Sequence, residues 1–357
     1  MGATREFAAG SRYIQGPGAL ARLWELGTVP GGRVVAVVDH HVLDLLSQQL
    51  TVGAPANSLI LPFSGEITAQ AIDALEAAAG GVDAVIAIGG GKAIDAGKAL
   101  ALRRLVPVMT VPTIASSDAP VSRGIAIYDD DHRMAVVLQL PANPHIVLVD
   151  TDVIAAAPPR YLSAGIGDAL AKKFEAEAAD ASGALNKHGT LPLLTGLIAA
   201  DGCYRVLRRH AVGAMNAARL GQPDKDLEAT VEACFLLAAL GFENTGLSMA
   251  HSVTRGLVRA RQVGAVLHGF HVAYGLLVQF AAEGRVDAEI TDLRSFLASV
   301  GLPRTLAEMG MSAPSRHDFE AMLDPILASP HIRNVPREVD RTSLLEALER
   351  IETFHPA

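Results

Sequence analysis

Three residues far apart in the chain, Asp168, His251 and His268, have the side chains of a metal site. One carboxylate and two imidazoles form a three-ligand set for a divalent cation and leave an open position for water or an alcohol. Spacing alone does not show that they converge, because an aspartate near a helix start commonly caps it and a histidine in an apolar helix is commonly only packed. His268 and His271, three residues apart, form an alternative pair on one helical face.

A glycine-rich segment, Gly89-Gly90-Gly91-Lys92, follows an apolar run that ends at Ile88 and precedes a helical pattern over 93–100. Glycines let the backbone approach a phosphate, and the free N–H groups of a helix start add partial positive charge. This position suits a pyrophosphate. Ile94 stands where a GxGxxG motif has its third glycine, so a simple tight turn between strand and helix is the alternative.

Two more segments offer polar groups after apolar runs. Asp39 ends the run 34–38, where a carboxylate can accept hydrogen bonds from a ribose diol and repel a 2′-phosphate, which favours NAD over NADP. The hydroxyl-rich segment 111–120 contains Asp118 and lies where α/β sheets usually bind ligands. A solvated turn is the alternative for this segment.

The elements that must position these residues change character along the chain. Uninterrupted apolar runs at 34–38, 84–88, 106–111 and 146–149 predict a parallel sheet covered on both faces, and a helix over 68–79, with Thr68 as its N-cap, completes a βαβ rhythm. The runs 125–128 and 134–140 predict a hairpin inserted in the sheet. Beyond Pro158 the apolar residues recur at the spacing of helices. We therefore predict an α/β domain over 1–158 and an all-helical domain over 159–357.

Composition narrows the classes of protein. The 357 residues include 38 acidic and 30 basic side chains, a formal net charge of −8, which argues against nucleic acid as a partner. Half of the residues are hydrophobic, yet no segment approaches the roughly 20 apolar residues of a membrane span. The only cysteines, Cys203 and Cys234, have no CxxC spacing, and the first residues lack a signal pattern. We expect a soluble, cytoplasmic protein without a membrane partner.

Six motifs, taken in order, resemble those of the glycerol dehydrogenases in the iron-containing (group III) alcohol dehydrogenase superfamily. They lie at 12–20, 89–98, 111–120, 164–170, 241–243 and 268–275. The resemblance implies the dehydroquinate synthase-like architecture: a Rossmann-like, NAD-binding α/β domain, an all-α metal-binding domain, and zinc in the cleft between them. It also implies a homo-oligomer, commonly an octamer. Two histidines and a carboxylate suit Fe²⁺ as well as Zn²⁺.

The resemblance also implies roles for individual residues. Asp168, His251 and His268 fall on the metal ligands, and Asp118 on a contact to a substrate hydroxyl. The cofactor positions are Asp39 at the ribose, Gly90, Gly91 and Lys92 at the pyrophosphate, and Asp95, Thr113, Ser116, Ser122, Gly124 and Tyr128 elsewhere. The implied activity is reversible hydride transfer from a secondary hydroxyl of glycerol, or of a related small diol or polyol, to NAD. A water or a cofactor hydroxyl is expected to relay the proton.

Several neighbours of these residues depart from the family pattern. From the position of His251 the family typically reads His-Ala-Ile-His-Asn-Gly, whereas this chain has lost the second histidine and gained Arg255. Phe270 and His271 replace a Glu-Lys pair, and Arg123 stands where a small residue is usual. An arginine facing the cleft would favour a hydroxycarboxylate or a polyol phosphate as substrate, whereas arginines at the surface would not. Two other classes stay open: a non-redox cyclase of the same superfamily, and an NAD-binding protein with altered catalysis.

Overall fold

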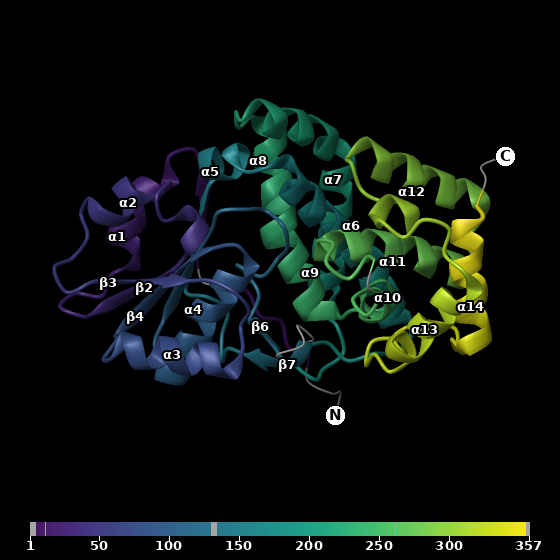
Figure 1. The fold of residues 1–357 in the computed structure, drawn as a ribbon, viewed down its shortest axis with the longest axis horizontal. Helices are drawn as coiled ribbons and strands as arrows, with labels where there is room; N and C mark the ends of the chain where they lie inside the picture. The colour runs from purple at the N-terminus through teal and green to yellow at the C-terminus, as the bar shows by residue number, and fades with distance from the viewer. Residues whose placement is uncertain (1–4, 11, 130–133, 261, 355–357) are drawn as a thin grey trace.

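A six-stranded parallel sheet forms the first half of the computed structural model, which describes residues 5–10, 12–129, 134–260 and 262–354 (Figure 1). The spatial order is β1-β8-β5-β4-β2-β3. The strands are β1 (Tyr13–Gly16), β2 (Val34–Asp39), β3 (Leu59–Phe63), β4 (Ala84–Gly89), β5 (Val108–Pro112) and β8 (Ile146–Asp150). The predicted parallel sheet is confirmed. The order reverses at β2, because β3 lies on one side of it and β4 on the other, and ligands bind at such switch points.

Both faces of the sheet are covered, as its uninterrupted apolar runs predict. Val35 and Val37 of β2 face a core shared with α3 (Ala69–Ala79) and α4 (Gly91–Arg104). Val34 and Val38 face the opposite core, beside η1 (Ala19–Arg22), α1 (Leu23–Gly27), η2 (His40–Val42) and α2 (Ser47–Thr51). The predicted N-cap is confirmed, since Oγ1 of Thr68 accepts a hydrogen bond from the backbone N–H of Ala71 at 3.1 Å.

The predicted hairpin exists, but its predicted place in the sheet is wrong. β6 (Gly124–Tyr128) and β7 (Met134–Gln139) pair antiparallel as a separate two-stranded sheet, while β5 and β8 are direct neighbours. β7 is exposed along its whole length, which a strand inside this two-sided sheet would not be. The predicted turn residues 130–133 lie outside the described part of the chain.

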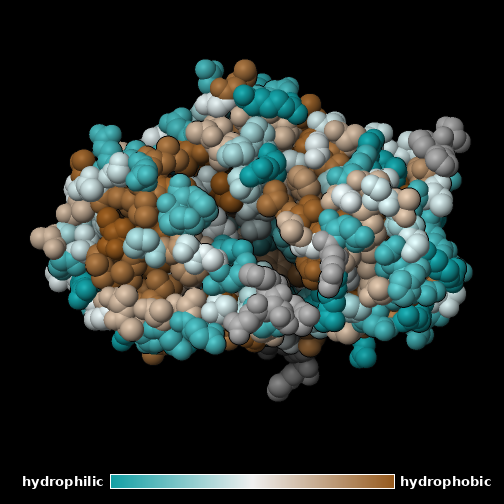
Figure 2. All heavy atoms as spheres, viewed as in Figure 1, coloured by the Kyte–Doolittle hydropathy of each residue, from teal (hydrophilic) through white to brown (hydrophobic). Residues whose placement is uncertain are grey.

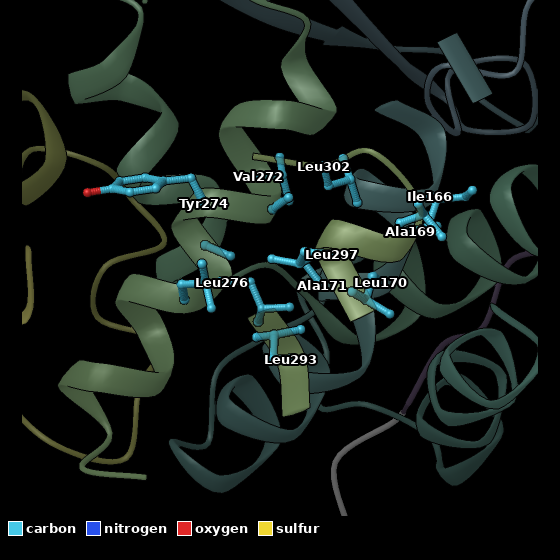
Figure 3. Close-up of a cluster of buried hydrophobic side chains, with 14 of the residues drawn as sticks. Ile166, Ala169, Leu170, Ala171, Val272, Tyr274, Leu276, Leu293, Leu297 and Leu302 are labelled. Carbon is cyan, nitrogen blue, oxygen red and sulfur yellow. The ribbon is translucent and has the colours of Figure 1, made fainter. Parts of the chain in front are cut away.

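Helices make up the second half, and no strand follows Asp150 among the described residues. They are α5 (Thr151–Ala156), α6 (Pro159–Ala181), α7 (Leu194–Leu220), α8 (Lys225–Glu232), the π-helical turn η3 (Ala233–Leu237), α9 (Ala238–Thr245), α10 (Met249–Leu257), α11 (His268–Ala282), α12 (Asp287–Ser299), η4 (Ala307–Met309), α13 (Arg316–Leu327) and α14 (Arg341–Glu352). Leu170, Val272 and Leu297 interlock α6, α11 and α12 in one core (Figure 3).

The domain boundary near residue 158 stays a prediction. β8 ends at Asp150 and α6 begins at Pro159, on either side of that position. The N-terminal segment also contacts the helices: the backbone N–H of Ala8 donates to Oδ1 of Asn244 on α9 at 2.7 Å. The two regions are therefore joined by more than the connection between them.

Glycines set how closely α6 and α11 approach. A Cβ atom added at Gly269 would lie 1.7 Å from the carbonyl oxygen of Ala164, and one at Gly167 would lie 2.4 Å from the carbonyl oxygen of Gly269. No side chain fits at either position without moving a helix. Because Asp168 and His268 are the direct neighbours of these glycines, the close crossing brings the two side chains together.

Among the described residues, no single helix is both long and apolar enough to cross a membrane. One pair of segments, Lys225–Thr245 and Met249–Leu257, meets the length and composition test jointly but is bent by 102°.

Candidate active site

The three residues predicted as metal ligands converge where the sheet region meets the helices, and the surface is hollowed between these two regions (Figure 2). Oδ1 of Asp168 lies 3.2 Å from Nε2 of His251 and 4.0 Å from Nε2 of His268. Ligand atoms of a tetrahedral zinc site lie about 3.4 Å apart. Asp168 stands in the middle of α6 rather than at its start, so the interpretation of this residue as a helix cap is wrong.

Glu175 holds the ring of His251 in a defined orientation. Nδ1–H of His251 donates to Oε2 of Glu175 at 2.5 Å, while Oε1 accepts from the backbone N–H groups of Ser248 and His251. This bond assigns the proton to Nδ1 and leaves the lone pair of Nε2 facing Asp168. This lone pair and the carboxylate oxygen lie 3.2 Å apart, and the ammonium of Lys172 lies within 3.3 Å of both atoms.

Lys172, four residues after Asp168 on α6, supplies a positive charge next to these acceptors. Its Nζ lies 2.9 Å from Oδ1 of Asp168, 3.3 Å from Nε2 of His251 and 3.2 Å from Oδ2 of Asp118. Asp118 is buried, and its Oδ2 accepts no hydrogen bond from a described residue despite the ion pair. The carboxylate of Asp118 is thus paired with Lys172, and its contact to a substrate hydroxyl stays a prediction.

The site's charges follow from burial and pairing. Burial raises the pKa of Asp118, whereas for Asp168 the charges of Lys172 and the two histidines outweigh burial and lower the pKa. Burial lowers the pKa of His251, but Glu175 and Asp168 outweigh it, so the pKa is raised. Desolvation by the surrounding protein lowers the pKa of His268 to about 4, although 47% of its side chain is exposed. A neutral imidazole is the form that binds a metal.

The glycine-rich turn lies beside Asp39 at the switch point of the sheet. A Cβ atom at Gly89, whose φ is +142°, would lie 2.5 Å from Cβ of Asp39. Gly90 caps α4 without a side-chain hydrogen bond, so the first N–H groups of this helix keep their capacity for a phosphate. Lys92 lies at the same turn and forms an ion pair with Glu66.

The other predicted cofactor residues surround the loop after β5, but several side chains have internal roles. Asp95 forms an ion pair with Lys98, and its Oδ2 accepts a hydrogen bond from the backbone N–H of Ala126. Lys98, fully buried, also donates to the carbonyl groups of residues 119, 122 and 124, which fixes the loop that carries Asp118. The backbone N–H of Thr113 donates to the carbonyl of Gly89, which ties this loop to the glycine-rich turn. Thr113 and Ser122 are buried, whereas Ser116, Gly124 and Tyr128 are partly exposed. Burial, together with the negative charges of Asp95 and Glu66, raises the pKa of Tyr128 to about 12.

The two arginines that depart from the family pattern differ in their surroundings. Arg123 donates through Nη2 to Nδ1 of His188 at 2.9 Å, and its backbone N–H donates to Oε1 of Glu243 at 2.6 Å. Arg255 is partly exposed and forms no ion pair with another described residue. The alternative histidine pair does not form, since the ring of His271 is buried and bonds to the carbonyl of Val263.

Sequence reasoning missed Lys172 and Glu175. Both lie on α6 at positions four and seven residues after Asp168, which is the spacing of one helical face. That spacing, in an otherwise alanine-rich segment, was the available signal. Glu243, whose two oxygens hold the backbone of Arg123 and the side chain of Asn143, was recognised only as part of a motif.

The chain is similar to known proteins in sequence and in fold. The model of the iron-containing alcohol dehydrogenase family matches residues 10–151. A glycerol dehydrogenase from Pseudomonas putida is 38% identical over 351 residues, 96% of this chain and 96% of that protein. A glycolaldehyde reductase from Halobacterium salinarum is 35% identical over 328 residues, 90% of this chain and 89% of that protein. The crystal structure of glycerol dehydrogenase from Schizosaccharomyces pombe matches with a TM-score of 0.92 at 29% identity, over 99% of this chain and 91% of that one. The similarity therefore extends over both the sheet and the helices.

Proposed function

The chain belongs to the iron-containing alcohol dehydrogenase family and is an oxidoreductase of the glycerol dehydrogenase type, and on this premise we propose that it uses NAD and zinc to oxidise a secondary hydroxyl of a small diol. The convergence of Asp168, His251 and His268 carries this proposal. Glycerol or a related polyol is the proposed substrate class. Iron suits the same ligand set.

The residues present fit a divalent metal. Their ligand atoms all lie within 4.8 Å of one another, and a carboxylate oxygen faces an imidazole lone pair. Glu175 fixes the tautomer of His251 from behind, as a carboxylate commonly does for a metal-bound histidine. The lowered pKa of His268 keeps this ring neutral and able to bind.

The residues at the switch point fit a dinucleotide. The N–H groups at the start of α4 lack a side-chain cap, and Gly90 and Gly91 keep side chains away from them. Asp39 stands beside this turn with a carboxylate that can accept from a ribose diol. A negative charge there disfavours a 2′-phosphate, which supports NAD rather than NADP.

The chain's own groups then have separate tasks. When bound, the metal would supply a Lewis acid that lowers the pKa of the substrate hydroxyl, and NAD would supply the hydride acceptor. Asp168, His251 and His268 would hold the metal, and Glu175 would hold His251. Asp118 would accept a hydrogen bond from a second substrate hydroxyl, which would favour diols over simple alcohols. Lys172 keeps Asp118 and Asp168 in place by ion pairs.

Steady-state oxidation tests the proposal. Metal-free protein, reloaded with Zn²⁺ or Fe²⁺, is assayed for NADH formation with glycerol, 1,2-propanediol and a simple alcohol, with NAD and with NADP. We expect turnover that needs both a metal and NAD and that favours diols. NADH formation that persists in thoroughly metal-free protein would contradict the metal role, and no net NADH with any alcohol would favour a non-redox reaction.

A further inference from the structure

The ammonium of Lys172 contacts two of the atoms that would bind the metal. Its Nζ lies 2.9 Å from Oδ1 of Asp168 and 3.3 Å from Nε2 of His251, and these two acceptors lie 3.2 Å from each other. The side chains of Lys172 and Asp168 are each only 3% exposed, so protein groups rather than water must compensate their charges. Lys172 is therefore part of the ligand cluster and not a charge at its edge.

Nε2 of His251 cannot serve Lys172 and a metal at the same time. Because Glu175 accepts the proton of Nδ1 at 2.5 Å, Nε2 carries no hydrogen and has a single lone pair. That lone pair accepts from Nζ of Lys172, and a metal bound to His251 needs the same lone pair. Oδ1 of Asp168 has lone pairs for both partners. Metal binding must therefore break the bond between Lys172 and His251, whereas the ion pair with Asp168 can persist.

Charge repulsion also opposes metal binding beside Lys172. Nζ lies 2.9 Å from Oδ1 of Asp168, and a metal bound to this oxygen lies about 2 Å from it, so the two cations are no more than about 5 Å apart. Water screens buried charges much less than exposed ones, so this repulsion is strong. Removal of the ammonium should thus strengthen metal binding, although it also removes a partner of Asp168.

A second position is available to the ammonium of Lys172. Nζ lies 3.2 Å from Oδ2 of Asp118, a buried oxygen that accepts no hydrogen bond from a described residue, and 5.0 Å from the ring centroid of Phe242. A rotation of the Lys172 side chain toward Asp118 would release Nε2 of His251 and form that hydrogen bond. The released ammonium would keep a carboxylate and the face of an aromatic ring as partners, without moving to solvent.

We propose that Lys172 competes with the metal: its ammonium bonds Nε2 of His251 when no metal is bound and turns to Asp118 when the metal binds. This inference rests on the proposed function, because it concerns the same three ligands. The ammonium stays protonated throughout and only changes its partner. The competition weakens metal binding, and it stabilises the metal-free protein because the buried acceptors of Asp168 and His251 keep a cation beside them. The chain therefore holds its metal less tightly than the ligands alone would.

Competition for Zn²⁺ with a chromophoric chelator at fixed pH tests the proposal. Lys172→Met should bind Zn²⁺ about 10-fold or more tightly than the wild type, and its metal-free form should unfold at a lower temperature than the metal-free wild type. Lys172→Arg keeps the charge and should gain no affinity. Lys173→Met is the matched control, because this neighbouring lysine is 20% exposed and pairs with Glu177 and Asp201, so its loss should change the affinity by less than about 2-fold.

The direction of the change in Lys172→Met decides between competition and support. A lysine that only holds Asp168 in place would weaken Zn²⁺ binding when removed, so unchanged or weaker binding would overturn the proposal. If Lys172→Met does not fold, Lys172→Gln, whose amide can still bond Asp168, must show the gain instead. Weakened binding in Asp168→Asn assigns the Zn²⁺ to these ligands. If neither the wild type nor Lys172→Met binds Zn²⁺ there, the proposed metal site is wrong and the competition with it, whereas wild-type binding without a gain in Lys172→Met refutes the competition alone.

Discussion

Replacing Glu175 by glutamine should weaken metal binding without changing a predicted ligand. The Glu175 side chain is fully buried and accepts from Nδ1–H of His251 at 2.5 Å, from the N–H of Ser248 at 2.8 Å and from the N–H of His251 at 3.0 Å. Glutamine keeps the shape but removes the charge that strengthens all three bonds. Loss of such a partner behind a metal ligand typically costs about 10- to 100-fold in metal affinity, or about 1.4–2.8 kcal/mol.

Competition with a chromophoric chelator at several pH values measures this loss. Glu177→Gln is the matched control, because Glu177 lies two residues further along α6, is 49% exposed and, within the described part of the chain, pairs with Lys173 alone. A second readout separates orientation from general damage: the pKa of His251 in metal-free protein, followed by NMR, should fall, because Glu175 is the largest contribution that raises it. A folded Glu175→Gln protein with wild-type zinc affinity and an unchanged histidine titration would refute the reasoning.

Three further outcomes follow from the same geometry. Metal affinity should fall as the pH drops, because protons compete with the metal for the histidine ligands. His251, with its raised pKa, is protonated first, and His268 only near pH 4, so a plot of the logarithm of affinity against pH should steepen in two steps. A pH-independent affinity would contradict this. Asp39→Asn should lower the ratio of kcat/KM for NAD to that for NADP by about 10-fold or more, because it removes charge-assisted hydrogen bonds to the ribose and the repulsion of a 2′-phosphate. An unchanged ratio would show that Asp39 is not part of the cofactor site. Gly269→Ala should lower the free energy of unfolding by about 1–3 kcal/mol and weaken zinc binding, since its Cβ would lie 1.7 Å from the carbonyl oxygen of Ala164, and calorimetry showing wild-type stability would disprove the close crossing.

The sheet was predictable because its central strands are uninterrupted apolar runs between turn residues. β1 and β3 were not predicted, since both are short and largely half-buried, which removes that signal. The hairpin was recognised from its two runs, but its position was not, because sequence does not say which strand pairs with β5.

The candidate site was predictable in its residue types but not in its geometry. The resemblance selected Asp168, His251 and His268, and only the crossing of helices shows that they converge. Lys172 and Glu175 were missed because a charged side chain on a helix usually faces water. Their burial follows from how α6 packs, which is tertiary information.

The crossing of α6 and α11 also limits what the glycine motifs around Asp168 and His268 can mean. Gly167 and Gly269 are required by the contact between two backbones, whatever ion or substrate the neighbouring side chains hold. A descendant that drifted to a different reaction, or lost catalysis altogether, would lose stability if it replaced these glycines. Retention of the two glycines in a related protein therefore indicates a shared fold, and only the charged and imidazole side chains next to them indicate shared chemistry.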